Sequence, residues 1–170
     1  MGLFSRFSSK GSAKADPKAG GESLEAPEIA RTLLGQAVGR YVNSAFQGPA
    51  DRLIAELRHG IETAGEQSAM PPLQRARALD AEFVKRTHQL RADVKAKALQ
   101  DTQKLHAFSV ENGLGAAFAQ FLDQHIEERT KDLVMAGLEL LVDAAHDLKV
   151  ADNYWRTEHP ELAARFPVVT

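Results

Sequence analysis

Apolar residues recur at spacings of three and four over three long stretches of the chain, residues 27–64, 72–112 and 114–149. This spacing gathers apolar side chains on one face of an α-helix and leaves polar ones on the other. Each stretch covers roughly 36–41 residues, whereas the average helix has about 11–12. Because helices of similar length can bury one another from end to end, we predict an all-α fold, an elongated antiparallel bundle of three helical rods.

Gly48 and Pro49 interrupt the pattern of the first rod. Proline inside a helix removes one backbone hydrogen bond and clashes with the preceding turn, so it kinks or ends the helix. We expect the first rod to be broken or sharply kinked at this dipeptide. Its two halves should lie end to end, because only their combined length matches the other two rods.

The second and third rods are joined by a very short connection at Asn112 and Gly113. Glycine caps helices well because it tolerates a positive φ, and so short a connection implies an antiparallel hairpin. Residues 72–112 carry 8 basic and 5 acidic groups, whereas residues 114–149 carry 3 basic and 7 acidic groups. The two rods should therefore attract each other.

Three parts of the chain differ in composition. Residues 1–26 are rich in Ser, Gly, Ala and Lys, which predicts a flexible tail. Residues 27–149 form the predicted bundle. Residues 150–170 are predicted to pack over one end of it, with a short final helix opened by Pro160.

The overall composition limits the classes of function. The chain has 170 residues, of which 44% are hydrophobic and only 6% aromatic, so the core must consist mostly of aliphatic side chains. Cysteine is absent, which excludes disulfides, thiolate nucleophiles and cysteine-based zinc sites. No apolar run approaches the ~18–20 residues that span a bilayer, and the start of the chain lacks the apolar core of a secretory signal.

Two pairs of residues resemble the Glu-x-x-His motif of di-iron bundles, namely Glu56 with His59 and Asp143 with His146. At 100° per residue all four side chains point away from the apolar faces of their helices, so we interpret them as surface residues. The sequence also lacks a glycine-rich phosphate loop and a recognisable nucleophile triad. We therefore expect no catalytic residue, cofactor or metal, with a helical-bundle enzyme or metal protein as a third alternative.

Basic residues are frequent on the second rod, but they spread around the helix instead of clustering on one face. Asp93 and Asp101 lie among them, and no aromatic residue interleaves as a stacking platform. We interpret this surface as the complement of the acidic third rod and expect no binding of nucleic acid. The basic residues concerned are Lys85, Arg86, Arg91, Lys95, Lys97 and Lys104.

Two features predict how the rods pack. Asp101 falls on the apolar line of the second rod, and folding the hairpin about Gly113 places His125 opposite, because each is 12 residues from that glycine. We predict a buried Asp101–His125 hydrogen bond that fixes the register; the alternative is two solvated side chains. Gly35 and Gly39 have the spacing of close helix contacts, which we interpret as tight packing.

The first residues of the chain combine large apolar and basic side chains. Leu3, Phe4 and Phe7 would share one side of a short helix, next to Arg6 and Lys10, as an interfacial membrane anchor requires. Residues 1–7 resemble the amphipathic start of membrane sensors of the phage-shock-protein A type, a resemblance that ends before the rods. An inert tail, or an export or targeting signal, are the alternatives for this segment.

Near the other terminus, Tyr154 and Trp155 are adjacent. Exposed Trp and Tyr are favoured anchors of protein interfaces, so the pair is a candidate interaction site. The alternative, which we favour for a lone Trp after a helix, is a cap on the end of its own bundle.

The sequence thus favours a non-enzymatic bacterial adaptor or scaffold that binds another protein. The rod shape offers long side faces, and the broad apolar face of the first rod also predicts self-association. We expect a cytoplasmic protein, tethered at the inner face of the membrane by its N-terminus. The main alternative is a secreted effector that carries a type III-like export signal in residues 1–26.

Overall fold

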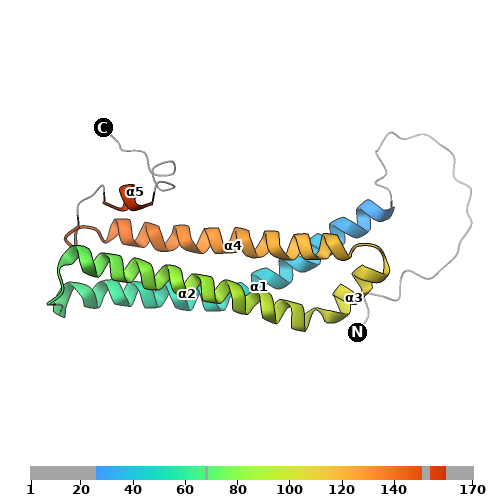
Figure 1. The fold of residues 1–170 in the computed structure, drawn as a ribbon, viewed down its shortest axis with the longest axis horizontal. Coiled ribbons are helices and arrows are strands. Elements are labelled where there is room, and N and C mark those ends of the chain that lie inside the picture. Colours follow the sequence, from blue (N-terminus) through green and yellow to red (C-terminus); the bar gives the residue numbers. More distant parts are fainter. Residues whose placement is uncertain (1–25, 68, 151–153, 160–170) are drawn as a thin grey trace, which may run out of the picture.

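The structure of the protein, a computed structural model, describes residues 26–67, 69–150 and 154–159. Within these ranges it contains five helices and no strand, so the predicted all-α fold is confirmed. Figure 1 shows α1, α2 and α4 side by side along the long axis, with α2 antiparallel to both of the others. The helices are α1 (Ala26–Gln67), α2 (Pro72–Asp101), α3 (Gln103–Glu111), α4 (Gly115–Asp143) and α5 (Tyr154–Glu158).

Helix α1 passes through Pro49 as one continuous helix of 42 residues. Of the two predicted outcomes at Gly48-Pro49, a break is therefore wrong and a kink is compatible with the continuous helix, since proline cannot donate the backbone hydrogen bond that would reach the Ala45 carbonyl. The helix persists because it is held by packing on both sides of the proline, where Phe46 and Leu53 are buried. In Figure 1 the first part of α1 crosses α4 obliquely and the remainder runs beside α2.

The ends of the rods also differ from the expected ones. Helix α1 continues to Gln67, through residues expected to form a loop, and the second rod divides at Thr102 into α2 and α3. Helix α4 ends at Asp143, and turns follow it as far as Lys149, which has a positive φ of 56°. The turn between α3 and α4 agrees with the prediction, since Gly113 has a φ of 72°. The three rods therefore do not end together.

Aliphatic and aromatic side chains from the three long helices form one hydrophobic core. The polar stretch 127–132 leaves α4 uninterrupted, as expected, because Thr130 is buried there and its hydroxyl donates to the Ile126 carbonyl at 2.7 Å. Burial of apolar surface, worth about 25 cal/mol per Å², is the main stabilising contribution. The most deeply buried large side chains are Val38, Val42, Phe118, Ile126, Leu138, Leu141, Leu148 and Trp155.

Ion pairs join the basic helix α2 to the acidic helix α4, as their opposite charges predict. The Arg91 guanidinium lies 2.8 Å from the Glu127 carboxylate, and the Lys95 ammonium lies 2.6 Å from Asp123. These groups are roughly half exposed, so solvent screens the attraction between them. The pairs therefore set the register of the two helices more than their stability.

Helix α5 closes the end of the bundle opposite α3. The Trp155 side chain is completely buried in the core, so it caps the bundle and cannot serve as the exposed interface anchor that was one of its two predicted roles. His159 Nε2 lies 2.8 Å from Asp80 Oδ2, and Arg77 pairs with Glu158 at 3.4 Å. The side chain of Tyr154, and Pro160 with the rest of the predicted final helix, lie outside the described residues.

Helix α4 approaches α2 closely at Gly137. A Cβ atom added to this buried glycine would overlap the ring of Phe83, which is itself only 3% exposed and cannot move aside. A Cβ at Gly60 of α1 would instead meet the end of the Leu79 side chain, which is half-buried. None of the described helices is long and apolar enough to cross a membrane.

We expect Gly137→Ala to lower the free energy of unfolding by about 1–3 kcal/mol, because the added methyl group forces the core apart. Gly60→Ala is the matched control and should cause no loss, since Leu79 can change rotamer and alanine favours the helix by about 0.5–1 kcal/mol over glycine. Urea unfolding followed by circular dichroism measures both. A Gly137→Ala protein as stable as the wild type would contradict this packing.

Candidate interaction surface

A bend at Thr102 shapes one end of the molecule. The backbone of Thr102 has φ −104° and ψ 18°, and its hydroxyl donates to the Ala98 carbonyl at 2.6 Å. Hydrogen bonds of this kind often accompany a bend in a helix, although Thr130 makes one inside the uninterrupted α4; at Thr102 the backbone angles themselves depart from helical values. Backbone hydrogen bonds from Thr102 to Ala98 and from His106 to Thr102 persist, so the chain changes direction without unwinding. Figure 1 shows α3 turning away from the axis of α2.

The bend changes the register of the hairpin. His106 of α3 stacks near Phe118, with ring centroids 5.0 Å apart, which is close to the expected folding about Gly113. On α2, however, Lys95 pairs with Asp123, whereas folding about Gly113 would have placed it opposite Lys131. Because α3 runs at an angle to α4, its residues advance less far along α4 than the same number of residues in a straight continuation of α2 would.

The predicted Asp101–His125 hydrogen bond is therefore wrong. Asp101 is exposed, and its carboxylate accepts a hydrogen bond from the Tyr41 hydroxyl at 2.6 Å and pairs with the Lys97 ammonium at 3.1 Å. His125 is half-buried, and its Nδ1 lies 3.4 Å from a Glu128 carboxylate oxygen. The sequence did show that Asp101 faces a neighbouring helix, but that helix is α1 and not α4.

The hydrogen bond between Tyr41 and Asp101 ties α1 to the last turn of α2. Burial and the hydrogen bond to Asp101 raise the pKa of Tyr41 to about 12. The hydrogen bonds from Tyr41 and Lys97 lower the pKa of Asp101. Both shifts favour the same state, a protonated phenol that donates to an ionised carboxylate.

Before Tyr41, α1 packs on α4 through small residues. A Cβ at Gly35 would lie 3.3 Å from the Phe121 ring, and a Cβ at Gly39 would lie 2.9 Å from His125 Nε2. The predicted role of these glycines in tight packing therefore corresponds to a contact between α1 and α4. Arg31 adds a guanidinium 5.8 Å above the Phe121 ring and a long hydrogen bond to Gln120.

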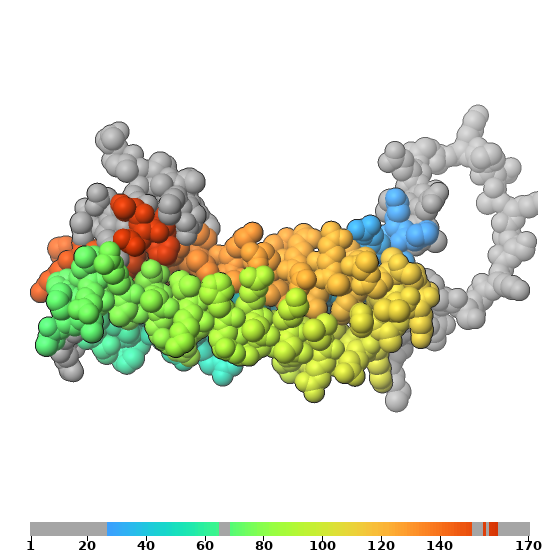
Figure 2. All heavy atoms as spheres, in the orientation of Figure 1, coloured from blue at the N-terminus to red at the C-terminus, as the bar shows by residue number. Residues whose placement is uncertain are grey.

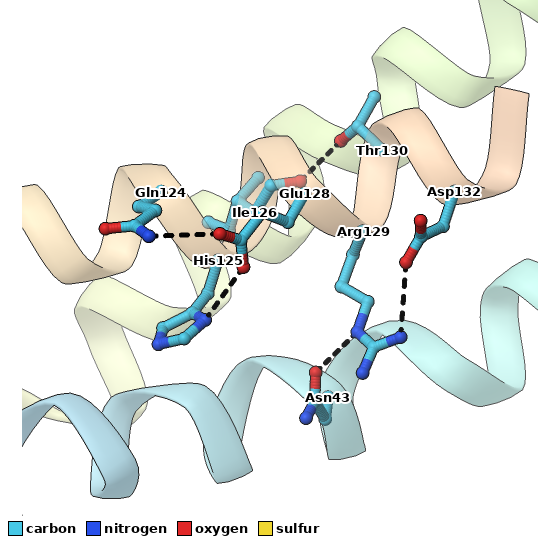
Figure 3. A network of polar contacts seen from close by, with 8 residues as sticks. All are labelled: Asn43, Gln124, His125, Ile126, Glu128, Arg129, Thr130 and Asp132. Atoms are coloured by element: carbon cyan, nitrogen blue, oxygen red, sulfur yellow. Dashed lines mark hydrogen bonds and ion pairs between the residues drawn. The ribbon is translucent and has the colours of Figure 1, made fainter.

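Further along the same interface, Arg129 of α4 bridges the two helices. Its Nε donates to Asn43 Oδ1 of α1 at 2.6 Å, and its Nη1 lies 3.4 Å from Asp132 (Figure 3). Figure 3 also shows Glu128, which accepts a hydrogen bond from Gln124 and lies near His125. The Gln124 hydrogen bond is the main reason why the pKa of Glu128 is lowered. These polar contacts lie along the edge of the interface between α1 and α4.

A groove lies beside Arg129, between α1 and α4. Its volume is about 320 Å³, with Phe46, Ile54 and Leu133 among its apolar walls and Asp51 and Arg129 among its polar ones. A second groove, of about 270 Å³, lies between α1 and α2. Both lie next to the Pro49 region of α1, and both are lined in part by charged side chains that already pair with residues of the neighbouring helix.

Residues that face α4 recur every four positions along this part of α1, namely Arg31, Gly35, Gly39 and Asn43. The parallel line through Tyr41, which faces α2, consists of Ala37, Leu33 and Ile29. Ile29 and Leu33 would therefore be covered by α2 if that helix continued straight beyond Asp101. Because the chain bends at Thr102, they are instead 45% and 48% exposed.

Helix α3 exposes the matching residue on the other side of the opening. Leu79 and Arg86, seven residues apart on α2, face Gly60 and Glu56 of α1. Phe108 follows Asp101 by seven residues, beyond the bend at Thr102, and it is 49% exposed.

We call Ile29, Leu33 and Phe108 the splayed face. It lies where α1 and α3 diverge on opposite sides of the start of α4 (Figure 1). In Figure 2 the start of α1 stands clear of the bundle at this end. Leu99 and Val110 are also exposed near it, on other sides of α2 and α3. The sequence placed Phe108 on an apolar line and gave no sign that its side chain would be about half exposed.

The remaining predicted site residues lie elsewhere. Glu56, His59, Asp143 and His146 are exposed, as their positions around the helices predicted. Among the described residues no group of three or more His, Asp or Glu side chains is arranged to hold a metal ion. Leu3, Phe4, Arg6, Phe7 and Lys10 lie outside the described residues.

Comparison with protein-family models, with curated proteins and with solved structures gives no match for this chain. Its function must therefore be inferred from the surface that its own fold creates.

We expect Tyr41→Phe to lower stability from about pH 5 to pH 9, and the difference from the wild type to shrink as the pH falls below about 4. The lowered pKa of Asp101 means that its contribution is present above the unfolded-state pKa and is lost as the pH falls through the folded-state pKa. The raised pKa of Tyr41 means that its own contribution is complete below about pH 10 and is lost as the pH rises towards 12.

Urea unfolding of both proteins across this pH range is the measurement. Asp93→Asn is the control, because Asp93 is an exposed carboxylate of α2 that accepts a hydrogen bond from Gln89 of its own helix. A cost of Tyr41→Phe that is the same at pH 3 and pH 7 would show that the hydroxyl does not act through the carboxylate.

Proposed function

We propose that this protein is a non-enzymatic interaction protein, an adaptor or scaffold that binds another protein through its splayed face. The observation that carries the proposal is the near half exposure of Ile29 and Leu33 at the point where the α1–α2 interface ends. Further along α1 the corresponding positions are half-buried from Ala37 to Pro49 and fully buried at Leu53 and Leu57. At this end the bundle thus has room for one more helix against α1.

The shape of the opening favours an amphipathic helix as the bound segment. Two helices diverge around the start of a third, so a helix laid between α1 and α3 would restore the three-helix packing of the rest of the bundle. Helices that dock in this way place apolar anchors at spacings of three, four and seven residues. The partner is therefore expected to present a Leu- or Phe-rich helical face to Leu33 and Phe108.

The experiment is site-specific photocrosslinking in the native cell, with a photoreactive amino acid at Leu33 or at Phe108. Leu73 is the matched control, because it is 43% exposed but lies at the start of α2, at the opposite end of the bundle. We expect the same partner to be crosslinked from both positions of the splayed face and not from Leu73.

The partner identified in this way is then purified and its affinity measured. The double variant Leu33→Ser/Phe108→Ser should bind about tenfold more weakly or worse, because truncation of central apolar anchors typically costs more than 1 kcal/mol each. Its melting temperature should stay close to that of the wild type, since both side chains are already half exposed. Equal affinity of the variant and the wild type would exclude the splayed face as the binding site.

A tether to the membrane is the second part of the proposed function. Its support is the sequence Leu3, Phe4 and Phe7 with Arg6 and Lys10, in a segment that precedes α1 at the splayed end. Apolar and basic side chains together bind anionic bilayers, although one short segment binds weakly. A tether of this kind would hold the adaptor at the cytoplasmic face of the membrane.

Flotation with vesicles of phosphatidylglycerol and phosphatidylcholine tests the tether. We expect the full-length chain to float and a chain that lacks residues 1–20 to remain at the bottom of the gradient. The variant Phe4→Ser/Phe7→Ser should also lose binding, and higher salt should weaken the binding of the full-length chain. Equal flotation of the full-length and shortened chains would rule out a tether in this segment.

A further inference from the structure

We propose that Asn112 is a site of spontaneous deamidation, which the folded turn between α3 and α4 holds back. The modification then accumulates in molecules whose α3–α4 end has opened, and the new carboxylate keeps that end open. The reaction consumes water and releases ammonia, so it needs no other reactant. It concerns this turn alone and is independent of any partner protein or membrane.

The sequence supplies the reactive pair, because Asn112 is the one asparagine of the chain that precedes a glycine. In the reaction the Gly113 backbone nitrogen attacks the Asn112 side-chain carbonyl carbon, Cγ. The side-chain nitrogen leaves as ammonia and takes the proton of the attacking nitrogen with it. Water then opens the resulting five-membered cyclic imide at either carbonyl, which gives an aspartate or an isoaspartate. Glycine favours the attack because it has no Cβ that would shield its nitrogen.

The folded turn engages the attacking nitrogen in a hydrogen bond. The Gly113 N–H donates to the Val110 carbonyl at 3.1 Å, and the Leu114 N–H donates to the Ser109 carbonyl at 2.7 Å. Together with the φ of 72° at Gly113, these two bonds form the Schellman arrangement of a helix C-terminus. Attack by the Gly113 nitrogen therefore requires that the cap of α3 first be broken.

The conformation of Asn112 also keeps the two reacting atoms apart. Its ψ is 15°, so the Gly113 nitrogen nearly eclipses the backbone nitrogen of Asn112. Closure of the imide ring requires the Gly113 nitrogen to eclipse Cβ instead, which takes a large rotation about the Cα–C bond. The side-chain amide is held as well, because its Nδ2 donates to the Phe108 carbonyl at 2.8 Å.

The position of the turn allows it to open without unfolding the whole bundle. Asn112 and Gly113 are exposed, and the turn lies at the end of the bundle opposite α5 (Figure 1). Helix α3 has nine residues, and a helix so short depends on packing for its stability. Exposed ends of this kind open at a lower free energy than the core, so local opening sets the rate of the reaction.

The product would weaken the cap that protects the site. A carboxylate oxygen in the place of Nδ2 would face the Phe108 carbonyl and be repelled by it. A negative charge at the C-terminal end of a helix is also unfavourable. An isoaspartate adds a carbon atom to the backbone, which displaces the Gly113 and Leu114 N–H groups from their acceptors. Deamidation should therefore favour the open form of this end.

Mass spectrometry of the peptide that contains Asn112 measures the rate, after incubation of the full-length chain in mildly alkaline buffer. We expect deamidation to be at least about tenfold faster in guanidinium chloride, where the protein is unfolded, a factor that corresponds to about 1.4 kcal/mol. A synthetic peptide of residues 108–116, measured in both buffers, corrects for the effect of the denaturant on the reaction. Equal corrected rates, or no reaction at Asn112 in the unfolded protein, would overturn the proposal.

Two matched core variants test whether opening of this end controls the rate. Phe118 and Phe83 are both almost completely buried. Phe118 lies in the first turn of α4 and contacts the His106 ring of α3, whereas Phe83 packs on Gly137 further along α4. With both variants folded by circular dichroism, Phe118→Leu should accelerate deamidation at Asn112 several-fold and Phe83→Leu should leave the rate unchanged. Equal acceleration by both would contradict control by this end.

The effect of the product is tested with Asn112→Asp, which introduces the same charge without the slow reaction. We expect Asn112→Asp to lower the melting temperature more than Asn112→Ala, which removes the same donor without adding a charge. The difference between the two variants should shrink as the pH falls below about 4, where the carboxyl group is protonated. If Asn112→Asp melts at the wild-type temperature at neutral pH, the modification does not favour opening and that half of the proposal is wrong.

Discussion

The fold depends on the buried stripe of α4, which both other long helices contact. The stripe runs from Phe118 to Leu141 at spacings of three and four residues and includes Thr130 and Gly137. Thr130 maintains the line through an otherwise polar stretch by bonding to its own backbone, and Gly137 admits the Phe83 ring of α2. Because α1 and α2 both pack on this stripe, a change in the position of its side chains would displace both helices.

The α1 helix shows how strongly this packing acts. Proline in a helix interior costs about 3 kcal/mol, yet α1 remains a single helix through Pro49. Buried side chains before and after the proline hold both halves against α2 and α4. The free energy gained by burying them exceeds the cost of the lost backbone hydrogen bond. The two shallow grooves beside Pro49 are lined in part by paired charges, so neither offers the exposed apolar side chains found at the splayed end.

The bend at Thr102 has the opposite effect, because there a local change of backbone conformation interrupts the packing of the apolar line on α1. It directs α3 away from α1, and Ile29 and Leu33 remain about half exposed. The far end of the bundle is closed by contrast, with Trp155 in the core and His159 bonded to Asp80. One end of the rod is thus sealed and the other open, and the open end is also where the N-terminal segment joins α1. That asymmetry is why the proposed binding and tethering both concern the same end.

The sequence by itself determined the helical class, the hairpin turn at Gly113 and the attraction between α2 and α4, because these follow from residue spacing, glycine conformation and charge. It also placed Glu56, His59, Asp143 and His146 on the surface, since a helix fixes the direction of each side chain relative to its neighbours. Only the tertiary structure decided that Pro49 does not break α1, that Asp101 meets Tyr41 instead of His125, and that Ile29 and Leu33 stay about half exposed. Each of these depends on which residues of neighbouring helices lie opposite one another. The bend at Thr102 changes this register, and the pattern of apolar residues does not reveal the bend.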